Sequence, residues 1–172
     1  RLIEIAGPEA GGNLQIARSR NDLAAGMSRL MMRERLILVG QRLLALRRTL
    51  IDVASQHTES LMPGITHTQP AQPTTLAHYL LGVIAPLERD FDRLQLALDH
   101  TNQSSFGVAA FTTTSFPINR QRVAELLGLP RIVENGYDAV GAGDHILESA
   151  AIMTNSAGSL SRFLYDLLVY SR

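Results

Sequence analysis

The chain has 172 residues, of which 45% are apolar and 19% are charged, and its sixteen acidic and sixteen basic residues cancel. This composition is typical of a packed domain rather than a disordered chain, and the neutral balance disfavours nucleic acid as a partner. The chain has no Cys, and every basic residue is Arg. Thiol nucleophiles, thiolate metal sites and lysine Schiff-base chemistry are therefore excluded for these residues.

Both ends of the sequence lie inside helical patterns. The first five residues resemble the tail of a helix, and residues 161–172 end without a helix stop signal. We therefore expect residues 1–172 to be a single helical region of a longer chain. No apolar run is long enough to cross a bilayer and no signal peptide pattern is present, so we expect a cytoplasmic protein with no membrane partner.

A loop is expected at residues 7–12, where Gly and Pro are frequent. A long helix is predicted over residues 21–60, because this stretch has no Pro and its apolar residues recur at helical steps. Those residues are Leu23, Met27, Leu30, Met31, Ile37, Leu38, Leu44, Ile51 and Ala54. A rod of this length is typical of helix bundles and oligomer cores, and Gly26 and Gly40 within it suggest close helix–helix approach.

The prolines of residues 62–73 break this helix, and a second long helix is predicted over residues 74–102, with a kink or a displaced hydrogen bond at Pro86. Residues 104–116 are expected to form a loop and residues 119–127 a short helix. Asp138 is the expected N-cap of a last helix that runs to the end of the sequence. No strand alternation is found, so the predicted fold class is all-α, a long-helix bundle.

The first candidate site is Ala17-Arg-Ser-Arg-Asn-Asp22, directly before the long helix. Two guanidinium groups, a hydroxyl and an amide beside a helix N-terminus suit a carboxylate or phosphate. The alternative is that Ser19 or Asn21 only caps the helix while the arginines are solvated, and spacing alone favours this alternative.

The second candidate site is Gly64-Ile-Thr-His-Thr-Gln69, in the Pro-rich break. His67 is the one histidine flanked by hydroxyls and an amide, and imidazole is well suited to proton transfer near neutral pH. Thr66 and Gln69 could hold a substrate oxygen. The alternative is a polar turn with local hydrogen bonds, and the residues leave the two interpretations equally weighted.

The other polar clusters are weaker candidates. We expect packing or capping roles for the four remaining histidines, His57, His78, His100 and His145. The hydroxyl cluster Thr112-Thr-Thr-Ser115 could hydrogen-bond an anion, but a plain turn is the favoured interpretation. His145 and Glu148 share a helix face, but two residues do not make a metal site, so neither metal nor cofactor is expected.

Five segments in one order resemble argininosuccinate lyase, a family of the fumarase/aspartase superfamily. They are Arg18-Ser-Arg-Asn-Asp22, Met62-Pro-Gly-Ile-Thr-His-Thr-Gln69, Ala71-Gln-Pro73, Ser115-Phe-Pro-Ile-Asn-Arg120 and Glu134-Asn-Gly-Tyr-Asp-Ala-Val140. The resemblance covers nearly the whole chain. It implies a fragment of the central helical domain of a homotetramer whose long helices form the seams between subunits.

The resemblance also implies a reaction, the β-elimination of argininosuccinate to arginine and fumarate in arginine biosynthesis. Ser19, Arg20, Asn21 and Thr66 would hold the carboxylates, His67 would serve proton transfer at the leaving nitrogen, and Gln69 would support the loop. The family's Ser-Ser-x-Met-Pro-x-Lys-x-Asn loop, which supplies the proposed serine base, is absent from these residues. We therefore expect the 172 residues alone to be inactive.

Several positions differ from the family pattern. Ala17 stands where the family has Gly, Gly136-Tyr137 replaces Ser-Leu, Gly141-Ala-Gly-Asp144 replaces Ser-Asp-Arg-Asp, and Ala110-Phe-Thr-Thr-Thr114 replaces Ala-Leu-Ala-Gly-Thr. Two alternatives to argininosuccinate cleavage stay open. One is a related lyase for a different succinyl adduct, and the other is an inert structural homologue that keeps the helical assembly.

Overall fold

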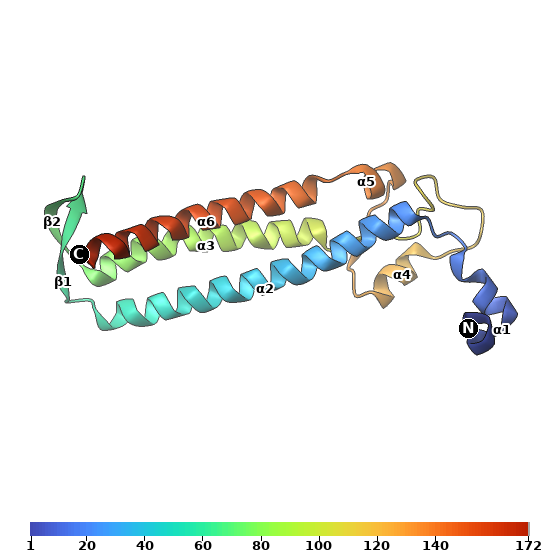
Figure 1. The fold of residues 1–172 in the computed structure, drawn as a ribbon, viewed down its shortest axis with the longest axis horizontal. Coiled ribbons are helices and arrows are strands. Elements are labelled where there is room, and N and C mark those ends of the chain that lie inside the picture. Colours follow the sequence, from blue (N-terminus) through green and yellow to red (C-terminus); the bar gives the residue numbers. More distant parts are fainter. Residues whose placement is uncertain (172) are drawn as a thin grey trace. The chain divides into compact units, whose positions relative to one another are not determined.

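A computed structural model describes residues 1–171, which are mostly helical (Figure 1). The chain divides into two compact units. Unit 1 comprises Arg1–Glu34 and Asp99–His145, and unit 2 comprises Arg35–Leu98 and the residues from Ile146 onward. The predicted all-α class is confirmed. None of the helices in the described residues is long and apolar enough to span a membrane.

The first residues of unit 1 form helix α1 (Leu2–Gly12), followed by a 3-10 turn η1 (Asn13–Gln15). The expectation of a loop at residues 7–12 is therefore wrong. Gly7 has φ 80° and ψ 164°, which interrupts the helix, and Pro8 then starts a second helical stretch. Proline is well tolerated at a first helical position, because the N–H it lacks has no partner there.

The rest of unit 1 is built from short elements around a small core. Strand β3 (Gln103–Ser104) pairs in parallel with β4 (Arg131–Ile132), and the helices are α4 (Arg120–Leu126) and α5 (Gly136–Gly141). The core residues are Val108, Val133 and Ala139. The short helix predicted at residues 119–127 is confirmed, and Asn119 caps it by accepting from the Arg122 backbone N–H at 2.8 Å.

Asp138 is not the N-cap of the last helix. It lies inside α5, and the N-cap of α5 is Asn135, whose side chain accepts from the Tyr137 and Asp138 backbone N–H groups. The last helix, α6 (Asp144–Tyr170), begins six residues after Asp138. The two caps could not be separated from the sequence, because Asn and Asp are both strongly preferred at this position.

Unit 2 contains the long segments of α2 (Arg20–Gln56), α3 (Leu76–Thr101) and α6, which confirm the predicted long helices. Its core joins residues of α2 and α3, with Leu160 and Phe163 of α6 packed against them; the buried members are Leu43, Leu50, Ala54, Ala77, Leu80, Ile84 and Leu87. Helix α3 is continuous through Pro86. An added Cβ at Gly40 would lie 3.1 Å from a methyl group of Leu94, so glycine allows close approach of α2 and α3.

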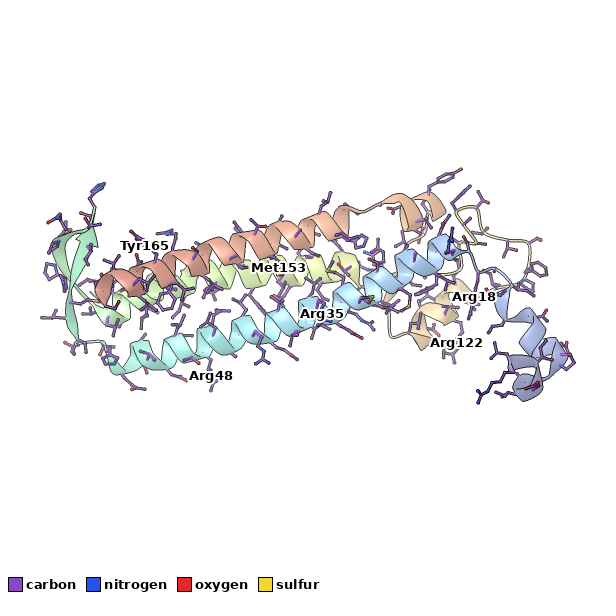
Figure 2. The ribbon with its side chains drawn as sticks, viewed as in Figure 1. Arg18, Arg35, Arg48, Arg122, Met153 and Tyr165 are labelled. Atoms are coloured by element: carbon purple, nitrogen blue, oxygen red, sulfur yellow. The ribbon has the colours of Figure 1, made fainter. Side chains whose placement is uncertain are left out.

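Helix α2 carries two apolar faces in unit 2, and of the residues listed from spacing in this part only Ala54 is buried. The buried positions recur at steps of four, three, seven and four, at Leu36, Gly40, Leu43, Leu50 and Ala54. A second set spaced by seven residues is exposed, with Ile37 at 43%, Leu44 at 44% and Ile51 at 45%. The charged side chains of Arg35 and Arg48 extend from the same helix (Figure 2).

The Pro-rich break between α2 and α3 is an antiparallel hairpin of β1 (Leu61–Thr66) and β2 (Gln69–Thr75). The absence of helix there is confirmed, but the strands were not predicted. Pro63 pairs with Pro73 across the hairpin, with an irregularity between Pro63 and Ile65. Prolines of this kind are accepted only in edge strands, and they remove the alternating pattern that signals a strand.

Candidate active-site segments

The first candidate segment forms the N-terminus of α2. The Ser19 hydroxyl accepts from the Asn21 backbone N–H at 3.1 Å, and Asp22 accepts from the Ser19 backbone N–H at 2.8 Å. This reciprocal pair is a capping box. Ser19 therefore caps the helix, as the alternative interpretation expected, while the side chains of Arg18, Arg20 and Asn21 are exposed. An anion at this end would meet two guanidinium groups and the positive end of the helix dipole.

Asp22 also ties this helix start to the loop that follows β3. It is 1% exposed, and its second carboxylate oxygen accepts from the backbone N–H groups of Gly107 and Ala109, at 3.2 and 3.4 Å. Ala109, Ala110 and Thr113 of this loop have positive φ angles. Such strained backbone persists only where the surroundings enforce it, and it is common at functional sites.

Arg120, at the start of α4, also holds the loop that follows β3, through hydrogen bonds to backbone carbonyls. Its guanidinium donates to the backbone carbonyls of Phe106 at 3.2 Å, Glu134 at 3.1 Å and Val133. Burial lowers the pKa of Arg120, and the nearby carboxylates of Asp22 and Glu134 oppose this shift. The Thr112–Ser115 cluster lies within the loop as the expected turn, where the Thr114 hydroxyl accepts from the Phe116 backbone N–H.

The second candidate segment is the turn of the hairpin in unit 2. Thr66 ends β1, Gln69 begins β2, and these two residues are paired. His67 and Thr68 between them both have positive φ, 49° and 64°. Two-residue hairpin loops with positive φ at both positions normally use Asn or Gly, so this pair is strained. All four side chains are exposed, and the turn therefore presents the His67 imidazole to solvent.

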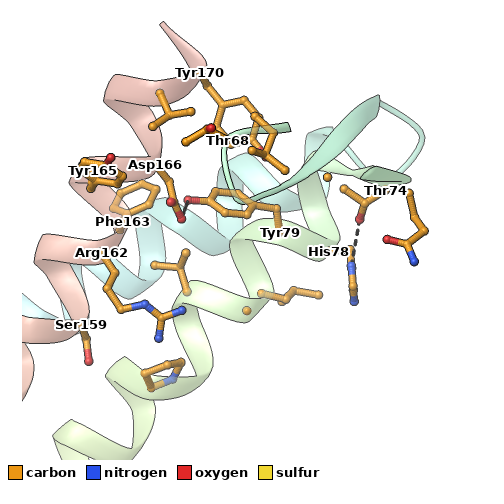
Figure 3. A pocket seen from close by; sticks show the side chains of 18 of the residues that line it. Thr68, Thr74, His78, Tyr79, Ser159, Arg162, Phe163, Tyr165, Asp166 and Tyr170 are labelled. Carbon is orange, nitrogen blue, oxygen red and sulfur yellow. Dashed lines mark hydrogen bonds between the residues drawn. The ribbon is translucent and has the colours of Figure 1, made fainter. Parts of the chain in front are cut away.

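A large groove lies beside this hairpin in unit 2, with a volume of about 1210 Å³ (Figure 3). Residues of both hairpin strands, the turn, α3 and α6 line it, His67 and Thr68 among them. Figure 3 shows the Tyr79 hydroxyl directed at Asp166, to which it donates at 3.0 Å. Burial raises the pKa of Tyr79, as does the hydrogen bond to Asp166, so this hydroxyl stays protonated.

The structure thus gathers the predicted site residues into two groups. Ser19, Arg20 and Asn21 are consecutive at the start of α2 in unit 1, and Thr66, His67 and Gln69 surround the hairpin turn in unit 2. Neither group holds a metal-ligand cluster, since no set of three His, Cys, Asp or Glu side chains suited to a metal is found in the described residues.

Sequence reasoning assigned no role to Asp22, Arg120, Tyr79 or Tyr170. The Ser19-x-x-Asp22 spacing is a capping-box signal that predicts the first of these roles. Arg120 was part of a recognised segment, but nothing in the sequence indicates that its targets are backbone carbonyls. Tyr79 contacts Asp166, 87 positions away, and Tyr170 contacts Pro63, 107 positions away. No local sequence pattern indicates contacts over such separations.

The family described as lyase matches residues 1–172. The argininosuccinate lyase of Methanosarcina acetivorans is 46% identical over 171 residues, which cover 99% of this chain and 35% of that protein. Argininosuccinate lyase 1 of Shouchella clausii is 43% identical over 169 residues, which cover 98% of this chain and 34% of that protein.

Among solved structures, one described as EDDS lyase in complex with formate is similar to this chain. The TM-score is 0.92 at 31% identity, and the match covers 98% of this chain and 34% of the other. The chain therefore spans about a third of the length of the curated relatives and of the solved structure that it matches.

Proposed function

This chain belongs to the lyase family, and from that premise we propose that the full protein splits argininosuccinate into arginine and fumarate. The observation that carries the proposal is the identity of 46% with a named argininosuccinate lyase, which extends over 99% of the chain. On this proposal residues 1–172 are part of the central helical domain of a cytoplasmic enzyme of arginine biosynthesis.

The proposed reaction breaks a C–H and a C–N bond and forms the C=C bond of fumarate. A base takes a proton from the carbon next to a carboxylate, and negative charge spreads into that carboxylate as the bond breaks. The leaving guanidino nitrogen must gain a proton, so the site needs fixed donors for the carboxylates and an acid near the nitrogen.

The two candidate segments supply parts of this machinery. Arg20, Asn21 and the capped N-terminus at Ser19 offer cationic and N–H donors suited to a carboxylate, and Thr66 offers a hydroxyl. His67, exposed at its strained turn, is the proposed acid for the leaving nitrogen, and Gln69, which pairs with Thr66, supports the turn. The proposed base lies in the family's serine loop, which is not among these residues.

We also propose that the protein is a homotetramer whose active sites combine segments from different subunits. The exposed apolar face of α2, formed by Ile37, Leu44 and Ile51, supports this assembly, because side chains of this kind are normally covered.

His67→Asn in the full-length protein tests the catalytic assignment. Loss of general-acid catalysis should lower kcat by about 10²- to 10⁴-fold, measured as fumarate release from argininosuccinate. The matched control is His57→Asn, because His57 lies outside the turn and contacts Ser60 at 2.9 Å. We expect the control to keep its activity within about twofold. An active His67→Asn protein would contradict the assignment. A parent protein that releases no fumarate from argininosuccinate would leave the two alternatives, a different succinyl adduct or an inert homologue.

A different succinyl adduct is the second candidate substrate. The similarity to EDDS lyase, at 31% identity and TM-score 0.92, supports it, since that protein is named for another compound. The stacked Phe111 and Tyr137 rings, 4.8 Å apart, also stand at two positions where the chain departs from the argininosuccinate lyase pattern. Elimination rates on argininosuccinate, adenylosuccinate and aspartate would separate the candidates.

A further inference from the structure

Tyr170 of helix α6 contacts the hairpin that carries Thr66 and His67. The Tyr170 hydroxyl donates to the backbone carbonyl of Pro63 at 3.3 Å. Pro63 lies in β1, three residues before Thr66, and its carbonyl is part of the strand that leads into the turn. This contact therefore fixes the position of Pro63 in β1, and the strand continues from there to the turn at His67.

A second tyrosine orients the first. The Tyr79 ring of α3 meets the Tyr170 ring edge-on, with centroids 5.9 Å apart and an interplanar angle of 72°. Tyr79 is itself fixed, because its hydroxyl donates to Asp166 at 3.0 Å and its ring lies 6.5 Å from that of Phe163 (Figure 3). Edge-to-face aromatic pairs prefer this geometry, so α3 and α6 together hold the Tyr170 ring in one orientation.

The hairpin needs such support because it is weak by itself. A two-stranded hairpin is marginally stable in water, and this one also carries positive φ angles at His67 and Thr68. Its β2 side is fixed where the Thr75 hydroxyl accepts from the His78 backbone N–H at 3.2 Å, at the start of α3. Tyr170 supplies the corresponding attachment on the β1 side.

We infer that Tyr170 is a positioning residue that orients the hairpin turn so that His67 reaches the reacting nitrogen. This inference rests on the proposed function for the role of His67, but the attachment of the hairpin can be measured without activity. Tyr170 touches no substrate on this account and acts only through β1.

Tyr170→Phe in the full-length protein is the test, because it removes the hydroxyl and keeps the ring against Tyr79. One hydrogen bond corresponds to about a 3- to 10-fold effect, so we expect kcat to fall by this factor with KM nearly unchanged. Amide hydrogen exchange should accelerate in the peptide covering residues 61–75 and stay unchanged in α3. The matched control is Tyr165→Phe, on the same helix, because Tyr165 is 63% exposed.

The outcomes separate the inference from the proposed function. Unchanged kcat and unchanged exchange in Tyr170→Phe would overturn the inference, as would equal effects in the Tyr165→Phe control. Loss of exchange protection across α6 as well would indicate a general structural role and would also overturn it. If the parent protein releases no fumarate, the proposed function fails, while faster exchange confined to the hairpin would still support the attachment.

Discussion

Charged side chains that are buried or half-buried in unit 1 contact backbone groups of helix ends and loops. Asp22 accepts backbone N–H groups from the helix start and from the loop after β3. Arg29 is 4% exposed and donates to the backbone carbonyl of His100 at 2.9 Å, near the end of α3. Arg33, one turn further on, donates to the carbonyl of Gly128 beyond α4 at 3.0 Å. These contacts satisfy orphan groups of helix ends and loops, so the charges stabilise connections that apolar side chains could not make.

His145 gives unit 1 a dependence on pH. Its side chain is 6% exposed; burial lowers the pKa of His145 below its ordinary value of 6.5, and nearby Arg29 lowers it further, against Asp144 and Asp138. The folded pKa is therefore below the unfolded pKa, and the unfolded chain binds the proton more readily. The stability that neutral His145 contributes is therefore present above its pKa in the unfolded chain. It is lost as the pH falls toward its lower pKa in the folded protein.

We therefore expect the melting temperature of the parent protein to decrease as the pH is lowered from about 7.5 to about 5.5. The decrease should be smaller in His145→Gln. The comparison of parent and variant in full-length protein cancels the other titrating groups. His78→Gln, at an exposed position, is the control and should behave like the parent. Equal losses in parent and His145→Gln would contradict the expectation.

At the scale of elements, the sequence predicted the helices, which depend on local spacing. It missed the hairpin and the buried face of α2, which depend on contacts between distant residues. Both long helices and the helix at residues 119–127 followed from spacing, Pro positions and caps. The hairpin was missed because its prolines hide the strand pattern. In unit 2 the residues chosen from spacing were mostly the exposed face of α2. The buried face was missed, because Leu43 lies next to Leu44 in sequence and spacing alone does not say which of the two is buried. Of the candidate site, the exposed positions could be chosen from sequence, but the strained turn and its tyrosine attachment could not.

Helix α5 begins at Gly136, a position where the chain departs from the argininosuccinate lyase pattern. A Cβ at Gly136 would lie 1.9 Å from the backbone oxygen of Phe111, whose ring stacks on Tyr137. We expect Gly136→Ser, the residue that the resemblance places there, to destabilise the protein by about 1–3 kcal/mol, because backbone must shift. Urea denaturation of the full-length protein measures this change.

Gly141→Ser is the matched control for this substitution. Gly141 ends the same helix, the resemblance also places Ser there, and an added Cβ meets nothing within 4 Å. Its effect should stay within about 0.5 kcal/mol. Equal effects of the two substitutions would show that the close approach of Phe111 does not constrain α5.

At the scale of the whole molecule, the exposed face of α2 carries the proposal of self-association. Ile37, Leu44 and Ile51 recur every seven residues, which is the spacing of a helix seam that packs against another helix. The same helix already uses its other apolar face against α3, where Gly40 approaches Leu94. A long helix with two apolar faces is typical of the core of an assembly, because a helix at the surface of a monomer needs only one.

Leu44→Glu places a charge in the middle of this exposed face. If the face is a seam between subunits, the buried charge should shift the full-length protein from tetramer to smaller species, with lower fumarate release because shared sites are lost. Sedimentation velocity measures the change in assembly directly. Thr49→Glu is the control, since five residues turn the helix by about 140° and place the same charge outside the face. A tetramer that persists in Leu44→Glu would show that subunits meet elsewhere, whereas dissociation in both variants would implicate charge alone.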